Sequence, residues 1–187
     1  MENFEDKIRA YMEKEKEVLE KLPTEDINKV INVLEEARKK GAVVYVCGNG
    51  GSAATAAHYV TDFNKGVSLN QEHKYNLISL NDNIPSMTAI ANDIGYEHIF
   101  ETQLQGRMKP SDILLAISGS GNSKNVLRAA QYAKRTGAKV VALTGYDGGA
   151  LYKMADYNLH VPVDDMQITE DIHMIFDHLI VSVLMGK

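Results

Sequence analysis

The stretch Val43–Asp62, VVYVCGNGGSAATAAHYVTD, decides the fold of this chain. It begins with an apolar, β-branched run, Val43–Cys47, which is typical of a strand buried on both faces of a sheet. A glycine turn, Gly48–Gly51, follows, and the alanine-rich run after Ser52 has a high helix propensity. The pattern predicts a strand, a tight turn and a helix, with Ser52 as the N-cap of that helix.

The glycine turn has two interpretations. Unpaired backbone N–H groups and the helix dipole at such a turn bind anions, most often phosphate, but the glycines could also simply reverse the chain. The motif is neither GxGxxG nor a P-loop, which disfavours dinucleotide and ATP binding. A second stretch, Ile113–Asn125 (ILLAISGSGNSKN), repeats the strand, polar turn and helix and carries the hydroxyls of Ser118, Ser120 and Ser123. Because open α/β sheets bind ligands at the carboxyl ends of their strands, the two turns predict one phosphate pocket.

Composition and charge narrow the functional class. The 187 residues suffice for one α/β domain, and we expect residues 1–187 to form it. The net charge of −5 provides no basic face for a nucleic acid. A single cysteine, Cys47, suits a reducing compartment, and no apolar run reaches the roughly 20 residues of a membrane span. We therefore expect a cytoplasmic protein with no nucleic-acid or membrane partner.

The remaining chain alternates between strand-like and helix-like segments. The predicted strands are 43–47, 75–80, 113–117, 138–143 and 157–161. Helices are predicted around them, including one that ends at 64–66, one over 98–107 after a loop at 92–96, and a long apolar one over 164–186. This alternation predicts a parallel sheet covered on both faces. Residues 1–40 form two leading amphipathic helices, which either cover the sheet or pack on a partner subunit.

Three motifs carry a family resemblance. GNGGSAA with a histidine six residues after the serine, ANDIGYE near the middle, and SGSGNS after a later strand resemble the SIS (sugar isomerase) domain, and within it most closely the phosphoheptose isomerase group. The resemblance covers nearly the whole chain. It implies a flavodoxin-like five-stranded parallel sheet, a homotetramer, and an aldose–ketose isomerase acting on a sugar phosphate, most closely sedoheptulose 7-phosphate. The serine turn would hold the phosphate, and the implied sugar-lining positions are Asn49, Gly50, Ser52, Asn92 and Asp93.

The resemblance also implies an acid–base set. The family has a His and a Glu one turn apart after the glycine turn, and a Gln eight residues before a second His on the last helix. These positions hold His58, Asp62, Glu170 and His178. Some relatives bind zinc through the four positions, which implies zinc as a cofactor. From the residues alone, two imidazoles and two carboxylates could form a tetrahedral N/O metal site or serve metal-free acid–base chemistry.

The hypothesis for catalysis is that His178 is one proton-transfer group and that Asp62 or Glu170 is the other. Asp62 is one methylene shorter than the family's Glu, so it reaches less far. Singly, the histidines also have plainer interpretations: His58 as a hydrogen-bonded core residue, and His173 or His178 as subunit-interface residues. The shortened carboxylate also keeps open an alternative function, a non-catalytic phosphosugar-binding regulatory or scaffold protein similar to the SIS protein that associates with the replication initiator.

Overall fold

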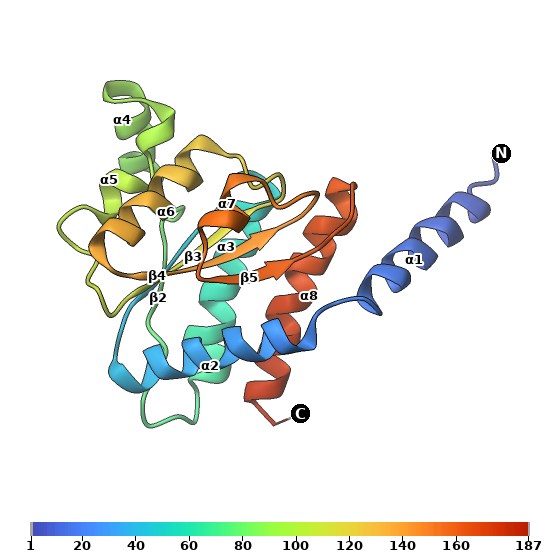
Figure 1. Ribbon diagram of the computed structural model, residues 1–187, viewed down its shortest axis with the longest axis horizontal. Coiled ribbons are helices and arrows are strands. Elements are labelled where there is room, and N and C mark those ends of the chain that lie inside the picture. The colour runs from blue at the N-terminus through green and yellow to red at the C-terminus, as the bar shows by residue number, and fades with distance from the viewer. Residues whose placement is uncertain (1, 187) are drawn as a thin grey trace.

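The computed structural model describes residues 2–186 and contains a five-stranded, fully parallel sheet (Figure 1). The strand order is β2-β1-β3-β4-β5. The strands are β1 (Val44–Cys47), β2 (Leu77–Ser79), β3 (Ile113–Ser118), β4 (Lys139–Thr144) and β5 (Tyr157–His160). In register, Val44 pairs with Leu77 on one side and with Ile113 on the other. The expected α/β class, strand number and parallel arrangement are confirmed.

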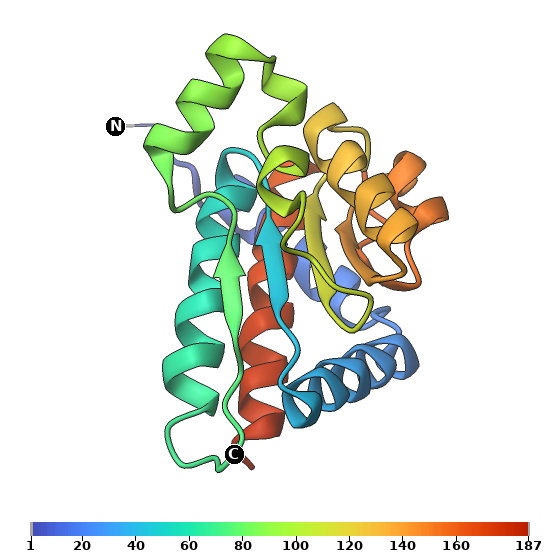
Figure 2. The same ribbon diagram turned by 90° about the vertical axis from the view of Figure 1, so that its left-hand side faces the viewer.

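Helices cover both faces of the sheet because successive strand residues alternate between two apolar clusters. Val44 and Val46 pack in one cluster, and Tyr45 and Cys47 pack in the other. The first face is covered by α2 (Thr24–Lys40), α3 (Gly51–Thr61) and α8 (Met166–Leu184). The second is covered by α5 (Glu101–Leu104), α6 (Lys124–Thr136) and α7 (Gly149–Met154). α3 and α8 run side by side away from the carboxyl edge of the sheet (Figure 2).

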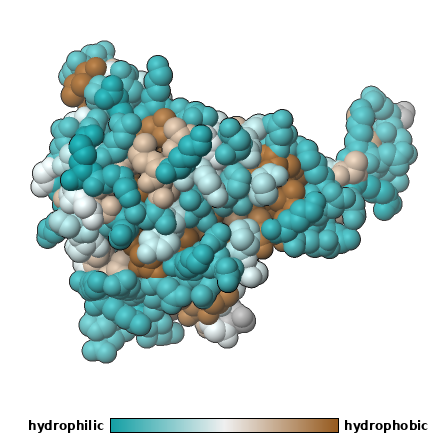
Figure 3. Space-filling view, in the orientation of Figure 1, coloured by the Kyte–Doolittle hydropathy of each residue, from teal (hydrophilic) through white to brown (hydrophobic). Residues whose placement is uncertain are grey.

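The two leading helices behave differently. α2 packs on the sheet, whereas α1 (Glu5–Leu19) projects from the body as an arm and buries only Val18 (Figure 1). Figure 3 shows this arm as mostly hydrophilic on the visible face, although Phe4, Ile8 and Met12 are exposed. α1 therefore does not cover the sheet. Packing of this arm on a partner subunit remains a prediction.

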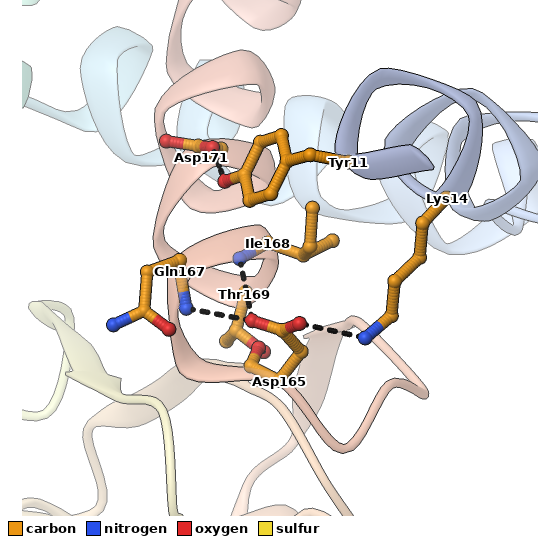
Figure 4. A network of polar contacts seen from close by, with 7 residues as sticks. All are labelled: Tyr11, Lys14, Asp165, Gln167, Ile168, Thr169 and Asp171. Atoms are coloured by element: carbon orange, nitrogen blue, oxygen red, sulfur yellow. Dashed lines mark hydrogen bonds and ion pairs between the residues drawn. The ribbon is translucent and has the colours of Figure 1, made fainter. Parts of the chain in front are cut away.

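Polar contacts hold the arm against the start of α8 (Figure 4). The Tyr11 hydroxyl donates to the Asp171 carboxylate, and the Lys14 ammonium lies 2.6 Å from Asp165 Oδ2. Asp165 is also the N-cap of α8 and accepts from the backbone N–H groups of Gln167 and Ile168. One carboxylate therefore both caps the helix and contacts the arm.

Some local expectations differ from the structure. α3 begins at Gly51, with Gly50 as its N-cap at φ 55°, so Ser52 lies in the first turn of the helix and is not the cap. The helix does not end at 64–66 but continues as a π-helical turn, Asp62–Val67, because this wider turn buries both Phe63 and Val67.

The middle segment also differs. A short helix was expected to end at Asn92, and α4 (Ile84–Asp93) ends one residue later, at Asp93, which was placed in the following loop. The Asn83 side chain caps the first turn of this helix. The helix expected over 98–107 is instead a 3₁₀ turn, Tyr96–His98, followed by the short α5. Between these two short elements the chain inserts Ile99 and Phe100 into the core. Within residues 2–186, no helix is both long and apolar enough to cross a bilayer.

Candidate active site

The two Gly/Ser turns meet at the carboxyl edge of the sheet and line one cavity of about 120 Å³. β1 leads into the first turn and β3 into the second, and these strands are neighbours in the sheet. The lining residues are Asn49, Ser52, Ile117, Ser118, Gly119, Ser120, Ser123, Met166 and Glu170. The structure thus brings the predicted serine hydroxyls and the start of α3 into the same pocket.

Hydrogen bonds fix the two turns relative to each other. The side-chain amides of Asn49 and Asn125 exchange two hydrogen bonds of 2.9 Å, which join the first turn to the beginning of α6. Ser118 Oγ lies 3.1 Å from Ser123 Oγ, and Ser123 is the N-cap of α6. The amino ends of α3 and α6 therefore both face this edge, and their unpaired N–H groups favour an anion.

Tyr96 is a pocket-associated residue that the sequence analysis missed. Its hydroxyl donates to Asn49 Oδ1 at 2.9 Å and ties the segment after α4 to the first turn. Asn92 and Asp93, which were predicted to line the sugar, lie exposed at the end of α4, where the Asn92 amide donates to Asp93. These two residues are not among those that line the cavity.

Glu170 reaches the pocket from α8 and lies over Gly51. A Cβ atom at Gly51 would come within 2.6 Å of Glu170 Oε1, so only glycine leaves room for this carboxylate. The carboxylate lies at the first turn of α3, where the positive end of the helix dipole favours negative charge. A carboxylate therefore shares the cavity with the three serines.

The other predicted acid–base residues form a separate group farther along α3 and α8. We call it the His–Asp cluster, and its members are His58, Asp62, Asp177 and His178. His58 Nε2 lies 3.0 Å from His178 Nε2 and 3.5 Å from Asp62 Oδ2. One donor atom from each of the four residues lies within 4.8 Å of the others. Glu170 is not a member, because it lies in the serine-lined cavity.

Asp177 was not identified from the sequence. Its side chain is fully buried, and neither carboxylate oxygen has a hydrogen-bond partner among the described residues. Burial, together with the nearby negative charge of Asp62, raises the pKa of Asp177 to about 7. The only available signal was an aspartate next to Phe176 within an otherwise apolar stretch of the last helix.

The burial of each histidine tests the plainer interpretations of these residues. The side chains of His58 and His178 are 42% and 55% exposed, so His58 is not a buried core residue. His173 is buried in the protomer, which corrects the suggestion that it lies at a subunit interface. Neither ring nitrogen of His173 has a hydrogen-bond partner within the described part of the chain. Burial lowers the pKa of His173 to about 4, and the nearby Thr144 backbone offsets only part of this effect.

Comparisons with known proteins agree with this architecture. The family model described as SIS domain matches residues 3–145. A phosphoheptose isomerase from Helicobacter pylori is 37% identical over 171 residues, which cover 91% of this chain and 88% of that protein. The structure of a phosphoheptose isomerase from Francisella tularensis superposes with a TM-score of 0.90 at 31% identity, over all of both chains. The phosphoheptose isomerase from Neisseria gonorrhoeae gives a TM-score of 0.89 at 27% identity, over 99% of this chain and 100% of that one.

Proposed function

This chain belongs to the SIS-domain family, and on that premise we propose that it converts sedoheptulose 7-phosphate into an aldoheptose 7-phosphate. The observation that carries the proposal is the meeting of two Gly/Ser turns and the Glu170 carboxylate in one cavity. The relatives named above, which are phosphoheptose isomerases, support an aldose–ketose isomerase over a scaffold protein. The substrate assignment rests on those relatives, and the serine-lined cavity supports a substrate that carries a phosphate group.

The phosphate would be held by Ser118, Ser120 and Ser123 together with the amino ends of α3 and α6. Asn49, Gly50 and Ser52 would contact the sugar from the first turn. Asn92 and Asp93 remain candidate sugar contacts, because the Tyr96–Asn49 hydrogen bond connects their segment to that turn. These anchors take no part in bond breaking, but they hold the reacting carbons near the proton-transfer groups.

The reaction moves a proton between C1 and C2 through a cis-enediol, which requires a base at carbon and an acid at the carbonyl oxygen. Glu170 is our candidate for the base, because its carboxylate shares the cavity with the phosphate-binding serines. In the metal-free protein, His178 is our candidate for the second group, with Asp62 beside it at 4.0 Å. His178 lies eight residues beyond Glu170 on α8, about 12 Å of helix rise. We therefore propose that His178 and Asp62 serve the cavity of a neighbouring subunit in a homotetramer.

Zinc is the proposed cofactor, and the residues fit it. His58, Asp62 and His178 offer two imidazole nitrogens and a carboxylate, which is a usual zinc donor set. A bound zinc ion would supply a Lewis acid that polarises the sugar carbonyl. The chain's own residues would orient the sugar and move the protons. Glu170, the fourth residue of the sequence-predicted metal set, lies in the cavity instead.

We also propose that the protein works in the cytoplasm. Its one thiol, Cys47, is buried and unpaired, and it lies in a central strand. Burial raises the pKa of this thiol to about 12, so it stays protonated and inert. A chain whose only cysteine is free has no disulfide to maintain and suits a reducing compartment.

The test is conversion of sedoheptulose 7-phosphate by the purified protein, followed by NMR of the aldoheptose phosphate, with EDTA and with added zinc. We expect turnover by the parent chain and strong loss in Glu170→Gln, which keeps the size of the side chain. The matched control is Glu97→Gln on the 3₁₀ turn, which does not line the cavity. Sugar-phosphate binding by calorimetry without turnover under any of these conditions would replace this proposal by a binding function.

A further inference from the structure

We propose that Asp177 is a donor in a divalent-cation site at the His–Asp cluster. The four donors are the side chains of His58, Asp62, Asp177 and His178. The inference deepens the proposed function, because such an ion would assist that reaction. It also stands apart from it, because ion binding is measurable without substrate.

The spacing of the donor atoms supports this assignment. In a tetrahedral zinc site with bonds of about 2.0–2.2 Å, neighbouring donor atoms are roughly 3.3–3.5 Å apart. The two histidine Nε2 atoms are 3.0 Å apart, and His58 Nε2 lies 3.5 Å from Asp62 Oδ2. Asp177 Oδ2 lies 4.0 Å from His58 Nε2, and Asp62 Oδ2 lies 4.0 Å from His178 Nε2. The four atoms all lie within 4.8 Å of one another, so shifts of about 1 Å or less would bring them to the corners of one tetrahedron.

The burial of Asp177 is the observation that points to a bound ion. Its side chain has no exposed surface, and no described residue donates a hydrogen bond to either oxygen. A buried carboxylate without partners is costly, and such groups are normally paired or bound to metal. Asp177 Oδ2 lies 4.0 Å from Nε2 of His58, an atom that can itself bind a metal. A cation between them would satisfy the carboxylate and both imidazoles.

Their positions along α8 distinguish Asp177 from Glu170 as the fourth donor of this site. Asp177 is adjacent to His178, whereas Glu170 lies about two turns of α8, roughly 12 Å, away from it. The Glu170 carboxylate is already placed over Gly51 in the cavity. Within one protomer, an ion at the His–Asp cluster therefore has Asp177 beside it, and the Glu170 of the same chain is left for the sugar.

The donor set also indicates which ions would bind. Two carboxylates and two neutral imidazoles leave a divalent ion formally neutral, which lowers the cost of holding it in a half-buried site. Imidazole donors favour zinc, cobalt or nickel over magnesium and calcium, which prefer oxygen ligands. The four donors have no sulfur among them, so a soft monovalent ion such as Cu(I) is disfavoured.

The test measures binding of Zn²⁺ and Co²⁺ by calorimetry, and the Co²⁺ absorption spectrum, on the full chain without substrate. We expect one ion per protomer in the parent. Asp177→Asn should weaken binding by at least about 100-fold, the upper end of what groups that merely support a ligand contribute. Glu170→Gln and the matched control Asp171→Asn, which removes an exposed carboxylate from the same helix, should keep the affinity and cobalt spectrum of the parent.

Thermal melts supply a second, independent measurement. In EDTA, Asp177→Asn should melt above the parent, because it removes an unpaired buried carboxylate. With excess zinc the order should reverse, because the ion stabilises only the chain that binds it tightly. If Asp177→Asn fails to fold, zinc-edge anomalous diffraction from crystals of the zinc-loaded parent locates the ion instead. A peak beside Asp177 supports the proposal, and a peak at Glu170 overturns it.

Several results would overturn the inference: no binding of either ion by the parent, unchanged affinity in Asp177→Asn, or loss of the ion in Glu170→Gln alone. Its failure is distinct from failure of the proposed function. Turnover that persists in EDTA, with no ion bound, would support the isomerase activity and contradict the metal site. Tight, Asp177-dependent zinc binding without turnover of sedoheptulose 7-phosphate would support the metal site and contradict the isomerase activity.

Discussion

Replacing Gly51 by alanine should lower isomerase activity without lowering stability. Gly51 lies in the first turn of α3, and its φ is not in the left-handed region, so an alanine fits the backbone. Alanine is favoured over glycine in helices by up to about 1 kcal/mol. The three atoms that the new methyl group would approach most closely all belong to the Glu170 carboxyl group. The fold should therefore keep its stability while Glu170 moves.

The size of that movement sets the expected loss. The Cβ atom would lie 2.6 Å from Glu170 Oε1, whereas ordinary contact begins at 3.4 Å. The carboxylate must therefore retreat by roughly 1 Å, and a displacement of that size at a reacting group can cost about 100-fold in rate. This corresponds to about 2.7 kcal/mol of transition-state stabilisation. The loss should appear in kcat more than in KM, because the serine turn is untouched.

The assay is steady-state turnover of sedoheptulose 7-phosphate, with thermal melts as the stability control. Gly66→Ala is the matched control, because Gly66 is also helical and a Cβ there meets nothing within 4 Å. In Glu170→Gln, adding Gly51→Ala should cause little further loss, since both changes act on the same carboxylate. Full activity in Gly51→Ala, or additive losses in the double variant, would refute the role given to Glu170.

Three further predictions concern the pocket, the core and the assembly. Ser120→Ala combined with Ser123→Ala should weaken sugar-phosphate binding by a few kcal/mol in calorimetry, because each hydrogen bond to a charged group contributes roughly 1.5–3 kcal/mol; unchanged affinity would move the phosphate elsewhere. The lowered pKa of buried His173 means that the unfolded chain binds a proton first as pH falls, so the free energy of unfolding should drop between pH 6.5 and 4, by up to about 3 kcal/mol. Chemical denaturation across that range should show a shallower drop in His173→Leu, and an equal drop would assign the acid sensitivity to other groups. Light scattering at micromolar concentration should give the mass of a tetramer, and a monomer mass would contradict a shared active site.

The sequence predicted the fold well because its signals were local. The apolar run before Gly48 and the run at 113–117 indicated buried strands, and their alternation with helices favoured parallel pairing. The boundary errors arose where packing overrode local propensity. The π-helical turn at Asp62–Val67 is one case. The lysine and glycine there suggested that the helix ends, but the turn continues to Val67 and buries both Phe63 and Val67 in the core.

The site was only partly predictable, because its decisive facts are contacts between distant segments. The serine turn followed from its own stretch of sequence. The pair His58 and Asp62 was implied by the family resemblance, and its i,i+4 spacing agrees with one face of a helix. The position of Glu170 over Gly51 depends on how α8 packs on α3, and no spacing rule reports it. Asp177 was hidden for the same reason: a carboxylate in a helix is ordinary, and only the packed structure shows that this one has neither solvent nor a hydrogen-bond partner among residues 2–186.

The projecting arm contributes little to the folding of the domain. α1 buries one residue, Val18, in its own protomer and touches α8 mainly through polar groups. Exposed polar contacts of this kind add little to stability, so substitutions on the arm should leave the domain folded. If the arm packs on a partner subunit, as predicted, such substitutions would change the quaternary arrangement of this protein while leaving the sheet, the cavity and the His–Asp cluster as they are.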